Sequence, residues 1–312
     1  MDAQWLWPGE ETWSKPLAFV ELDKVDLPLQ TITLPPCPVI GIGDEDHPLA
    51  EQLDAVIAAP ITAEALAQQV EAVPRSAATI VQLLRILPGL SREAGLTAES
   101  FAYAMLQGSD EHREWMSRQP ARETTSPGEG RIGLAREHER LIITLDRPEA
   151  GNAIDRIMRD GLYEAFSLAV LDPEITTVSL RAGGKVFSLG ADLGEFGTTV
   201  DPATAHAIRM QTLPARMVIP CAHMLDVHIN GACIGAGLEI AAFARRVTAS
   251  SRAWFQLPEL AMGMLPGAGG CVSLTRRIGR QRAALMILSG KRLSARHALD
   301  WGLVDAIVDD PA

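Results

Sequence analysis

The chain has 312 residues, 47% of them hydrophobic and 21% charged, with a formal net charge of -11. This composition predicts a globular protein with a sizeable core, in one large or two modest domains. The acidic balance argues against nucleic-acid binding, which relies on clustered Lys and Arg, and the pair Arg245 and Arg246 is too small to reverse it. No uninterrupted apolar run approaches membrane-spanning length, so no membrane partner is expected.

The cysteines and the first residues of the chain indicate the cellular compartment. Four cysteines share no CxxC spacing: Cys37, Cys221, Cys233 and Cys271. Neither a zinc site nor a disulfide framework is therefore predicted. The first residues include Glu10 and Glu11 and lack a basic leader before an apolar segment, so no secretory signal is expected. A reducing cytoplasm fits these features best.

The first third of the chain predicts mainly helices. Residues 35–43 (PPCPVIGIG) predict a short buried strand that enters a turn, and residues 62–72 predict a helix. A second helix is expected because four apolar residues fall on one helical face before the stop at Pro88-Gly89: Ile80, Leu83, Leu84 and Leu87. A third helix is expected at about 97–106.

A linker separates this region from the rest. Residues 119–131 (QPARETTSPGEGR) gather Pro, Gly, Ser, Thr and charge, a composition typical of a connection between two folded parts. We therefore predict an N-terminal, mainly helical region at 1–120, a linker at 121–131 and a core at 132–312.

The core predicts alternating strands and helices. Residues 141–145 and 176–180 are aliphatic or β-branched runs, with a helical stretch at about 154–170 between them. Another apolar run at 224–229 leads into the glycine-rich INGACIGAG and a helix that starts near Gly237. This alternation is typical of an α/β fold built from βαβ units.

Two glutamates stand alone in long apolar stretches. Glu239 is the only charged residue from 227 to 244, and Glu259 the only one from 253 to 275. Burial raises the pKa of a carboxyl toward neutrality, which suits a general acid or base. A capped or solvent-facing glutamate is the alternative for either residue. Two isolated acids, each beside a glycine-rich turn, favour a catalytic pair.

Two segments of small residues lie where strands are expected to give way to helices: FSLGADLGEF at 187–196 and INGACIGAGLE at 229–239. Backbone amides at such turns lack intrahelical partners, so two turns facing each other could bind a developing oxyanion. Neither segment matches the GxGxxG dinucleotide pattern or a phosphate-binding P-loop. The chain also lacks HExxH and GxSxG motifs, which disfavours a metalloprotease or a serine hydrolase, and no metal site is expected.

Five ordered segments together resemble the crotonase (enoyl-CoA hydratase/isomerase) superfamily: LIITLDRPEAGNAI, FSLGADLGEF, INGACIGAGLEIA, FQLPELAMGMLPGAGG and LSARHALDWGLVDAIV. The resemblance covers roughly residues 132–310. It implies a crotonase-like spiral of ββα units, preceded here by the mainly helical region. It also implies an oxyanion hole made by the backbone amides of Ala191 and Ala236.

The resemblance further implies an acyl-CoA thioester substrate, with coenzyme A as part of the substrate and no other cofactor. Glu239 and Glu259 match the two glutamates of family members that hydrate enoyl-CoA, which favours a hydro-lyase of fatty acid metabolism. In this assignment Glu239 activates water and Glu259 supplies the proton. Further substrate-binding residues are carried over by position: Leu189, Gly190, Asp192, Gly235, Pro258 and Gly267. An isomerase, a cofactor-independent oxygenase or a catalytically silent acyl-CoA-binding scaffold are the alternatives.

The sequence also departs from the family pattern. Gly194 and Glu195 stand where relatives often carry a basic residue near the CoA phosphates. The usual C-terminal helices, which cover the acyl site and help to build trimers, do not follow the core. Residues 96–118 resemble those helices instead, and LDAVIAAP at 53–60 echoes the terminal LVDAIVDDP. A circular permutation and an unrelated helical extension both explain this order, and the resemblance implies a homo-oligomer, a trimer or a hexamer.

Overall fold

The computed structural model describes residues 15–25, 32–119 and 128–308. Its largest sheet has six strands in the order β12-β9-β7-β6-β5-β4. All neighbouring strands are parallel except β4 and β5. Their bounds are β4 Arg131–Glu137, β5 Arg140–Asp146, β6 Thr177–Ala182, β7 Leu225–Ile229, β9 Arg246–Ala249 and β12 Ala306–Ile307. The predicted strands at 141–145, 176–180 and 224–229 are thus confirmed as β5, β6 and β7.

A second, three-stranded sheet in the order β11-β10-β8 lies beside the first. Its strands are β8 Ala232–Ile234, β10 Trp254–Gln256 and β11 Leu293–Ser294. The chain passes from β7 in the large sheet to β8 in the small sheet and then into α8 (Gly235–Ala241). It repeats this path through β9 and β10 before the short helix η8 (Glu259–Met262). The repeated path is the predicted spiral of ββα units.

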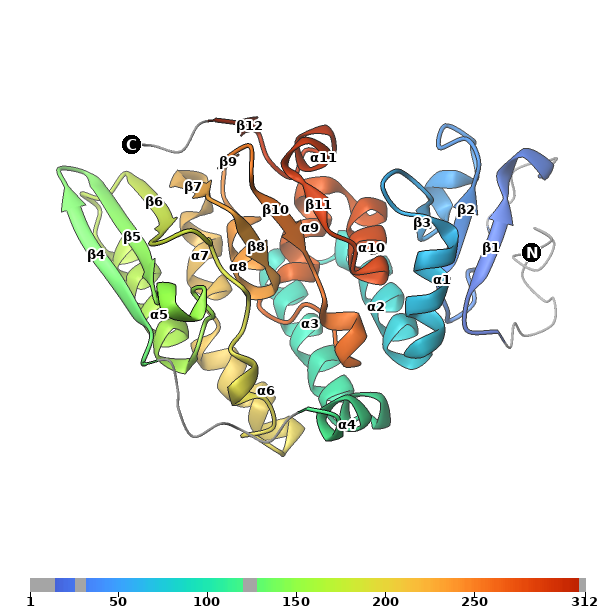
Figure 1. The fold of residues 1–312 in the computed structure, drawn as a ribbon, viewed down its shortest axis with the longest axis horizontal. Helices are drawn as coiled ribbons and strands as arrows, with labels where there is room; N and C mark the ends of the chain where they lie inside the picture. The colour runs from blue at the N-terminus through green and yellow to red at the C-terminus, as the bar shows by residue number, and fades with distance from the viewer. Residues whose placement is uncertain (1–14, 26–31, 120–127, 309–312) are drawn as a thin grey trace.

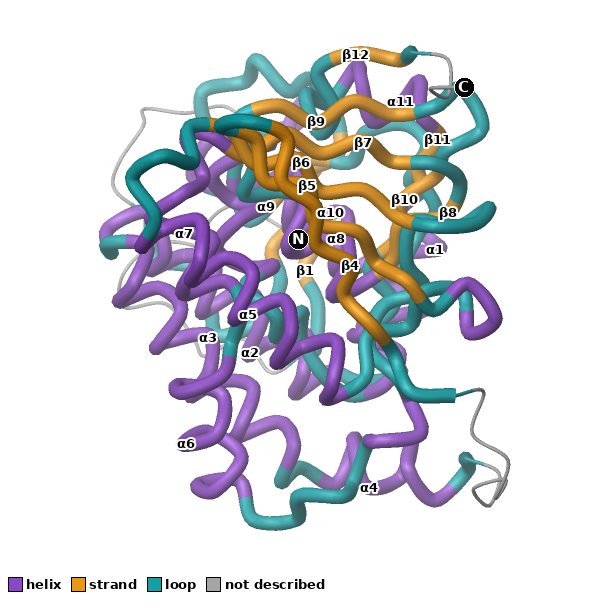
Figure 2. The backbone as a smooth tube through the Cα atoms, turned by 90° about the vertical axis from the view of Figure 1, so that its left-hand side faces the viewer, coloured by secondary structure: helices purple, strands orange, loops and turns teal. Residues whose placement is uncertain are grey.

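The remaining core helices cover the sheets. They are α5 Arg156–Leu171, α6 Pro202–Thr212, α7 Ala215–Cys221, α9 Gly270–Ile278, α10 Arg280–Ser289 and α11 Ala295–Asp300. Figure 2 shows the strands of the large sheet stacked beside one another, with α5 and α7 on one side of them. The predicted helix at 154–170 is α5, whose first turn is capped by Asp155 accepting the Met158 amide.

The N-terminal region has the four helices α1 Ala63–Ala72, α2 Pro74–Ile86, α3 Arg92–Gln107 and α4 Asp110–Ser117. Helix α3 begins five residues before the predicted start at Thr97, because Ser91 caps it by accepting the Ala94 amide. The region also contains a small parallel sheet of β1 (Ala18–Glu21), β2 (Val39–Ile42) and β3 (Ala55–Val56). Only β2 was predicted. The predicted linker at 121–131 lies largely outside the described residues.

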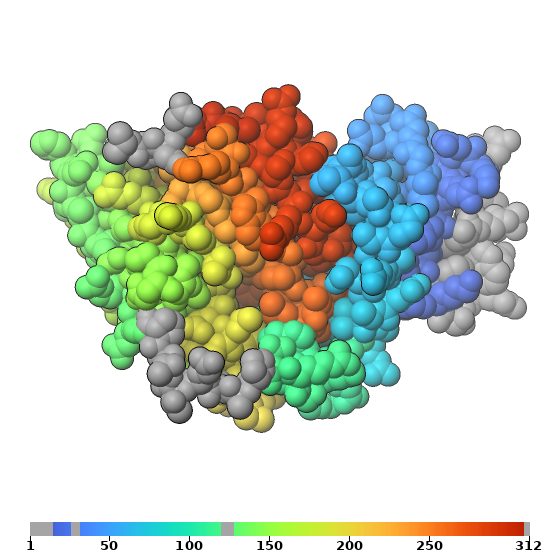
Figure 3. Space-filling view, in the orientation of Figure 1, coloured from blue at the N-terminus to red at the C-terminus, as the bar shows by residue number. Residues whose placement is uncertain are grey.

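The N-terminal helices pack directly on the core. Helix α3 contacts α6, α7 and α9, while α1 and α2 contact α10. Figure 1 shows α3 beside α6 and α9, and Figure 3 shows the green and cyan surface of this region against the orange part of the chain. At Gly95 a Cβ would lie 3.1 Å from Val272 on α9, so the missing side chain permits this close approach. The apolar face of α2 joins the same core cluster as the sheet strands.

The structure also bears on the cysteines and on membrane-spanning helices. The four cysteines are buried and none of them forms a disulfide with another described cysteine. Among the described residues, no helix has the length and apolar character needed to cross a membrane.

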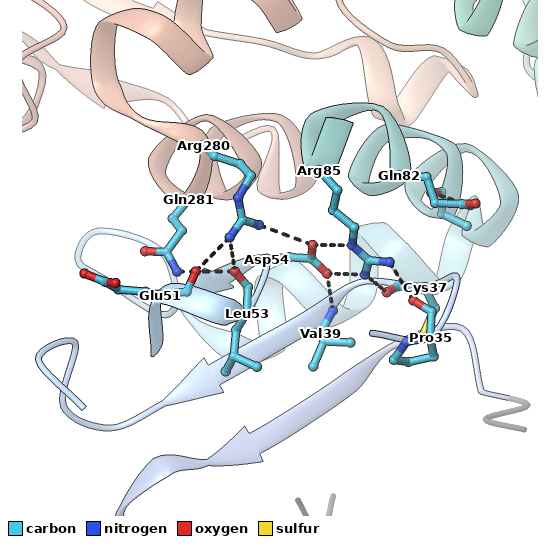
Figure 4. Close-up of polar contacts among 11 residues, drawn as sticks. Pro35, Cys37, Val39, Glu51, Leu53, Asp54, Gln82, Arg85, Arg280 and Gln281 are labelled. Atoms are coloured by element: carbon cyan, nitrogen blue, oxygen red, sulfur yellow. Dashed lines mark hydrogen bonds and ion pairs between the residues drawn. The ribbon is translucent and has the colours of Figure 1, made fainter. Parts of the chain in front are cut away.

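A buried ion cluster joins the small N-terminal sheet to the helices (Figure 4). Asp54, 1% exposed, accepts hydrogen bonds from the Val39 amide and from Nε and Nη2 of Arg85. Arg280 on α10 lies 3.5 Å from the same carboxylate and donates to the Leu53 carbonyl. One carboxylate therefore compensates two cations from different parts of the chain.

We expect Asp54→Ala to lower the free energy of unfolding by about 3 kcal/mol, because it leaves Arg85 and Arg280 without their shared anion. The arginines keep some solvent access, which places the cost at the lower end for a broken buried pair. Urea denaturation measures the change, with Asp46→Ala on the exposed neighbouring turn as the matched control. Equal stability of the two variants would contradict this role.

Candidate active site

The parallel register of the small sheet places the predicted site residues together. Ser188 forms a parallel bridge with Cys233, and Cys233 pairs in parallel with Phe255 on β10. Parallel neighbours run in the same direction, so the residues that follow each partner leave the sheet at the same edge. Ala191 and Ala236 each follow their bridge partner by the same spacing, and Glu259 follows Phe255. Ligands bind at this carboxyl edge in open α/β sheets.

The turn after Ser188 is fixed by buried hydrogen bonds. The Ser188 hydroxyl accepts the Gly190 amide at 3.1 Å and donates to the Asn152 carbonyl at 2.9 Å. Gly190 has a φ of 93°, and a Cβ there would lie 3.3 Å from the Ile234 carbonyl oxygen. A glycine is therefore needed for the two turns to approach each other.

The backbone amides of Ala191 and Ala236 lack an acceptor in their own element. Ile154 donates to the Gly190 carbonyl and accepts from the Asp192 amide, so the Ala191 amide between them points away from Ile154. Ala236 is the second residue of α8, where the amides have no intrahelical acceptor. Both residues line the same cavity.

Glu239 lies on α8 with 2% of its surface exposed. Its Oε2 accepts the amides of Ala268 at 2.6 Å and Gly270 at 2.8 Å. Burial raises its pKa to about 7, although the two amide bonds and the charge of Arg209 oppose the shift. This carboxyl can therefore gain or lose a proton near neutral pH.

Glu259 begins η8 and lies opposite the first turn of α8. A Cβ on Gly235 would be 2.6 Å from its Oε1, so the carboxyl packs directly on that glycine. Its Oε2 is buried and makes no hydrogen bond to the described residues. Burial, together with the nearby Glu239, raises the pKa of Glu259 well above its ordinary value.

A third buried carboxyl, Glu99, comes from α3 of the N-terminal region. It accepts the amides of Gly269 at 2.7 Å, Cys271 at 2.9 Å and Val272 at 3.3 Å. Burial and the neighbouring Glu239 raise its pKa well above the ordinary value, against the effect of these amide bonds. Glu99 thus holds the segment whose other amides hold Glu239.

These groups surround a cavity of about 750 Å³. All ten residues predicted from the sequence line it: Leu189, Gly190, Ala191, Asp192, Gly235, Ala236, Glu239, Pro258, Glu259 and Gly267. The Asp192 carboxylate itself is engaged, accepting Nη1 of Arg147 at 2.7 Å and the Gly194 amide at 2.8 Å. Its side chain therefore orders the turn.

Sequence reasoning missed several residues of the cavity wall. Tyr103 and Gln107 come from α3, His112 from α4 and Arg209 from α6. Gly267 is needed for this packing, since a Cβ there would lie 2.1 Å from the Tyr103 ring. The His112 ring is also hydrogen-bonded at 2.8 Å to the Met262 carbonyl at the end of η8. The resemblance of 96–118 to family helices was the available signal, but it did not single out these residues.

The packing bears on the proposed permutation. If residues 96–118 take the place of the family's C-terminal helices, they should pack against the pocket, and three of their side chains line it. The two segments that echo each other in sequence contain the short parallel strands β3 and β12. The permutation stays a prediction.

Comparisons with known proteins give a consistent result. The family model described as enoyl-CoA hydratase/isomerase matches residues 137–311. The 2,3-dehydroadipyl-CoA hydratase of Escherichia coli is 34% identical over 174 residues, 56% of this chain and 68% of that protein. The mevalonyl-coenzyme A hydratase of Beauveria bassiana is 32% identical over 178 residues, 54% of this chain and 64% of that protein.

A solved structure shows the same likeness. The crystal structure of enoyl-CoA hydratase from Thermoplasma volcanium matches with a TM-score of 0.52 and 35% sequence identity. The match covers 57% of this chain and 72% of that one. The chain spans 64% to 68% of the length of the two curated relatives named above.

The raised pKa of Glu239 predicts a pH-dependent stability. Its pKa is about 7 in the folded protein against 4.5 for the free side chain, so its contribution is present below pH 4.5 and is lost as the pH rises through 7. The free energy of unfolding of the neutral variant Glu239→Gln should therefore rise by about 3 kcal/mol relative to that of the unchanged protein as the pH goes from 4 to 8.

Urea denaturation across this pH range measures the difference. Glu164→Gln, at an exposed position of α5, is the matched control and should show a constant difference. A difference for Glu239→Gln that stays constant or falls with pH would show that the folded-state pKa is not raised.

Proposed function

Because this chain belongs to the enoyl-CoA hydratase/isomerase family, we propose that it hydrates a 2-enoyl-CoA thioester. The observation that carries the proposal is the pairing of two different carboxyls at one cavity. Glu239 is held by two backbone amides, whereas Glu259 Oε2 has no hydrogen-bond partner among the described residues. Hydration needs a base that takes a proton from water and an acid that donates a proton to carbon. In this proposal the two carboxyls supply these roles.

The thioester carbonyl oxygen would lie between the amides of Ala191 and Ala236. Attack of water at C3 moves negative charge onto that oxygen, and fixed amide donors stabilise such charge without reorganising. Each donor of this kind typically contributes about 3 to 4 kcal/mol to the barrier reduction. Since the donors are backbone groups, the alanine side chains need only point away from the ligand.

The two carboxyls would divide the proton transfers. Glu239, with a pKa of about 7, is substantially ionised at neutral pH and can accept a proton from water as the nucleophile attacks. Burial and the nearby Glu239 raise the pKa of Glu259 well above its ordinary value, which suits a carboxyl that would donate its proton to C2. The syn or anti course of addition depends on the placement of the substrate between them.

The CoA portion would contact the open side of the cavity. Gly194 and Glu195 offer no cation there, but Arg156 and Arg159 at the start of α5 also line the cavity. We propose that these arginines take over contacts to the CoA phosphates, which arginine side chains bind well. We also propose that the protein assembles as a homo-oligomer. The proposed reaction uses no cofactor other than the CoA of the substrate.

Loss of absorbance at the enoyl-thioester band of crotonyl-CoA tests the hydration. We expect Glu239→Gln and Glu259→Gln each to lower kcat by about 10²-fold or more, because each removes one proton transfer. Glu164→Gln should retain full activity. The alternatives give other outcomes: turnover that needs only one of the two acids favours an isomerase.

Binding of acyl-CoA without hydration of crotonyl-CoA or of longer and aromatic enoyl-CoA substrates would reject the hydratase. Isomerase, oxygenase and scaffold functions would then take precedence. Calorimetry with a saturated acyl-CoA separates a silent binding protein from one that does not bind the thioester at all.

The pH profile of kcat/KM provides a separate prediction. Because Glu239 acts in its ionised form, activity should rise with pH through an apparent pKa of about 7. A profile that decreases through pH 7 would reverse the assignment of base and acid.

A further inference from the structure

One wall of the cavity carries a cation that the hydration chemistry does not use. Arg209 on α6 is half-buried and lines the cavity. Its guanidinium carbon lies 3.8 Å from the centre of the Tyr103 ring, and its Nε donates to the Ser100 hydroxyl at 3.1 Å. These contacts fix the orientation of the guanidinium.

The guanidinium has an unused donor. Its Nη2 is buried and makes no hydrogen bond to the described residues. Within the described part of the chain, no carboxylate lies within ion-pair distance of Arg209. A buried charged donor without a partner is costly, and native proteins rarely leave one unless a ligand completes it.

Two neighbouring acids interact with this charge without an ion pair or a hydrogen bond to it in the described part of the chain. Glu99 and Glu239 are close enough to interact with Arg209 electrostatically, but both carboxyls have raised pKa values because of burial. Arginine stays protonated under all ordinary conditions. Arg209 therefore places a positive charge on the cavity wall.

We propose that Arg209 binds a carboxylate at the far end of the acyl chain, so that the substrate class is the CoA thioesters of dicarboxylic acids. This inference rests on the proposed acyl-CoA function and narrows its substrate. A carboxylate accepts from a guanidinium in a planar, charge-assisted contact, and Nη2 supplies the free donor for it. The Tyr103 ring beneath the guanidinium excludes water from one side of the contact.

A different role for Arg209 predicts different behaviour. If its charge served only to keep Glu239 ionised, its removal would affect every acyl-CoA alike, whatever the end of the acyl chain. Recognition of a carboxylate instead affects the preference between substrates. The ratio of two affinities is therefore the quantity to measure.

The experiment is calorimetric binding of saturated thioesters, which cannot be hydrated. Pairs matched in length, glutaryl against valeryl, adipyl against hexanoyl and pimelyl against heptanoyl, cover the unknown reach of the chain. We expect at least one dicarboxylic thioester to bind about tenfold or more tightly than its methyl-ended partner. Arg209→Gln should bring that ratio close to one, and Arg209→Lys should keep part of it.

Arg216→Gln on the neighbouring α7, outside the cavity lining, is the matched control and should keep the ratio. Circular dichroism verifies that each variant is folded. Equal binding of the two thioesters by the unchanged protein, or equal weakening of both in Arg209→Gln, would overturn the inference while leaving acyl-CoA binding intact. Failure to bind any thioester would reject the proposed function together with it.

Discussion

The carboxylate of Glu99 is the contact on which the site depends most. It reaches from α3 to the start of α9, across a separation of 170 residues to Gly269, and accepts three amides there. The amides of Ala268 and Gly270 in the same segment donate to Glu239 instead. Two buried acids thus bind the amides of one segment: Glu99 comes from the N-terminal region and Glu239 from the core. The N-terminal helices are therefore part of the site's framework.

The sheets provide the other half of the framework. Because β8 and β10 pair in parallel and Ser188 forms a parallel bridge with Cys233, turns that are far apart in sequence leave the small sheet at one edge. Small residues let these turns touch, and the backbone then supplies donors without any special side chain. The position of these backbone donors depends on strand register alone. The raised pKa values of Glu239 and Glu259 depend on burial as well.

The features that could be predicted are those visible in a short stretch of sequence. Glu239 and Glu259 stood out because their neighbours are uncharged, and the two turns because they are rich in small residues. Glu99 left no such mark, since charged residues such as Glu93 and Arg92 share its helix. Its partners are defined only by tertiary packing. The sheet of β1 and β3 was missed for a similar reason, because strands as short as Ala55–Val56 exist only through pairing with β2.

The order of the parts along the chain has a consequence for biosynthesis. Helices α2 and α3 are made well before α9 and α10, against which their apolar faces pack. During synthesis these apolar faces stay uncovered until the last third of the chain has left the ribosome. Long-range contacts of this kind slow folding and leave apolar surface open to chaperones or to aggregation.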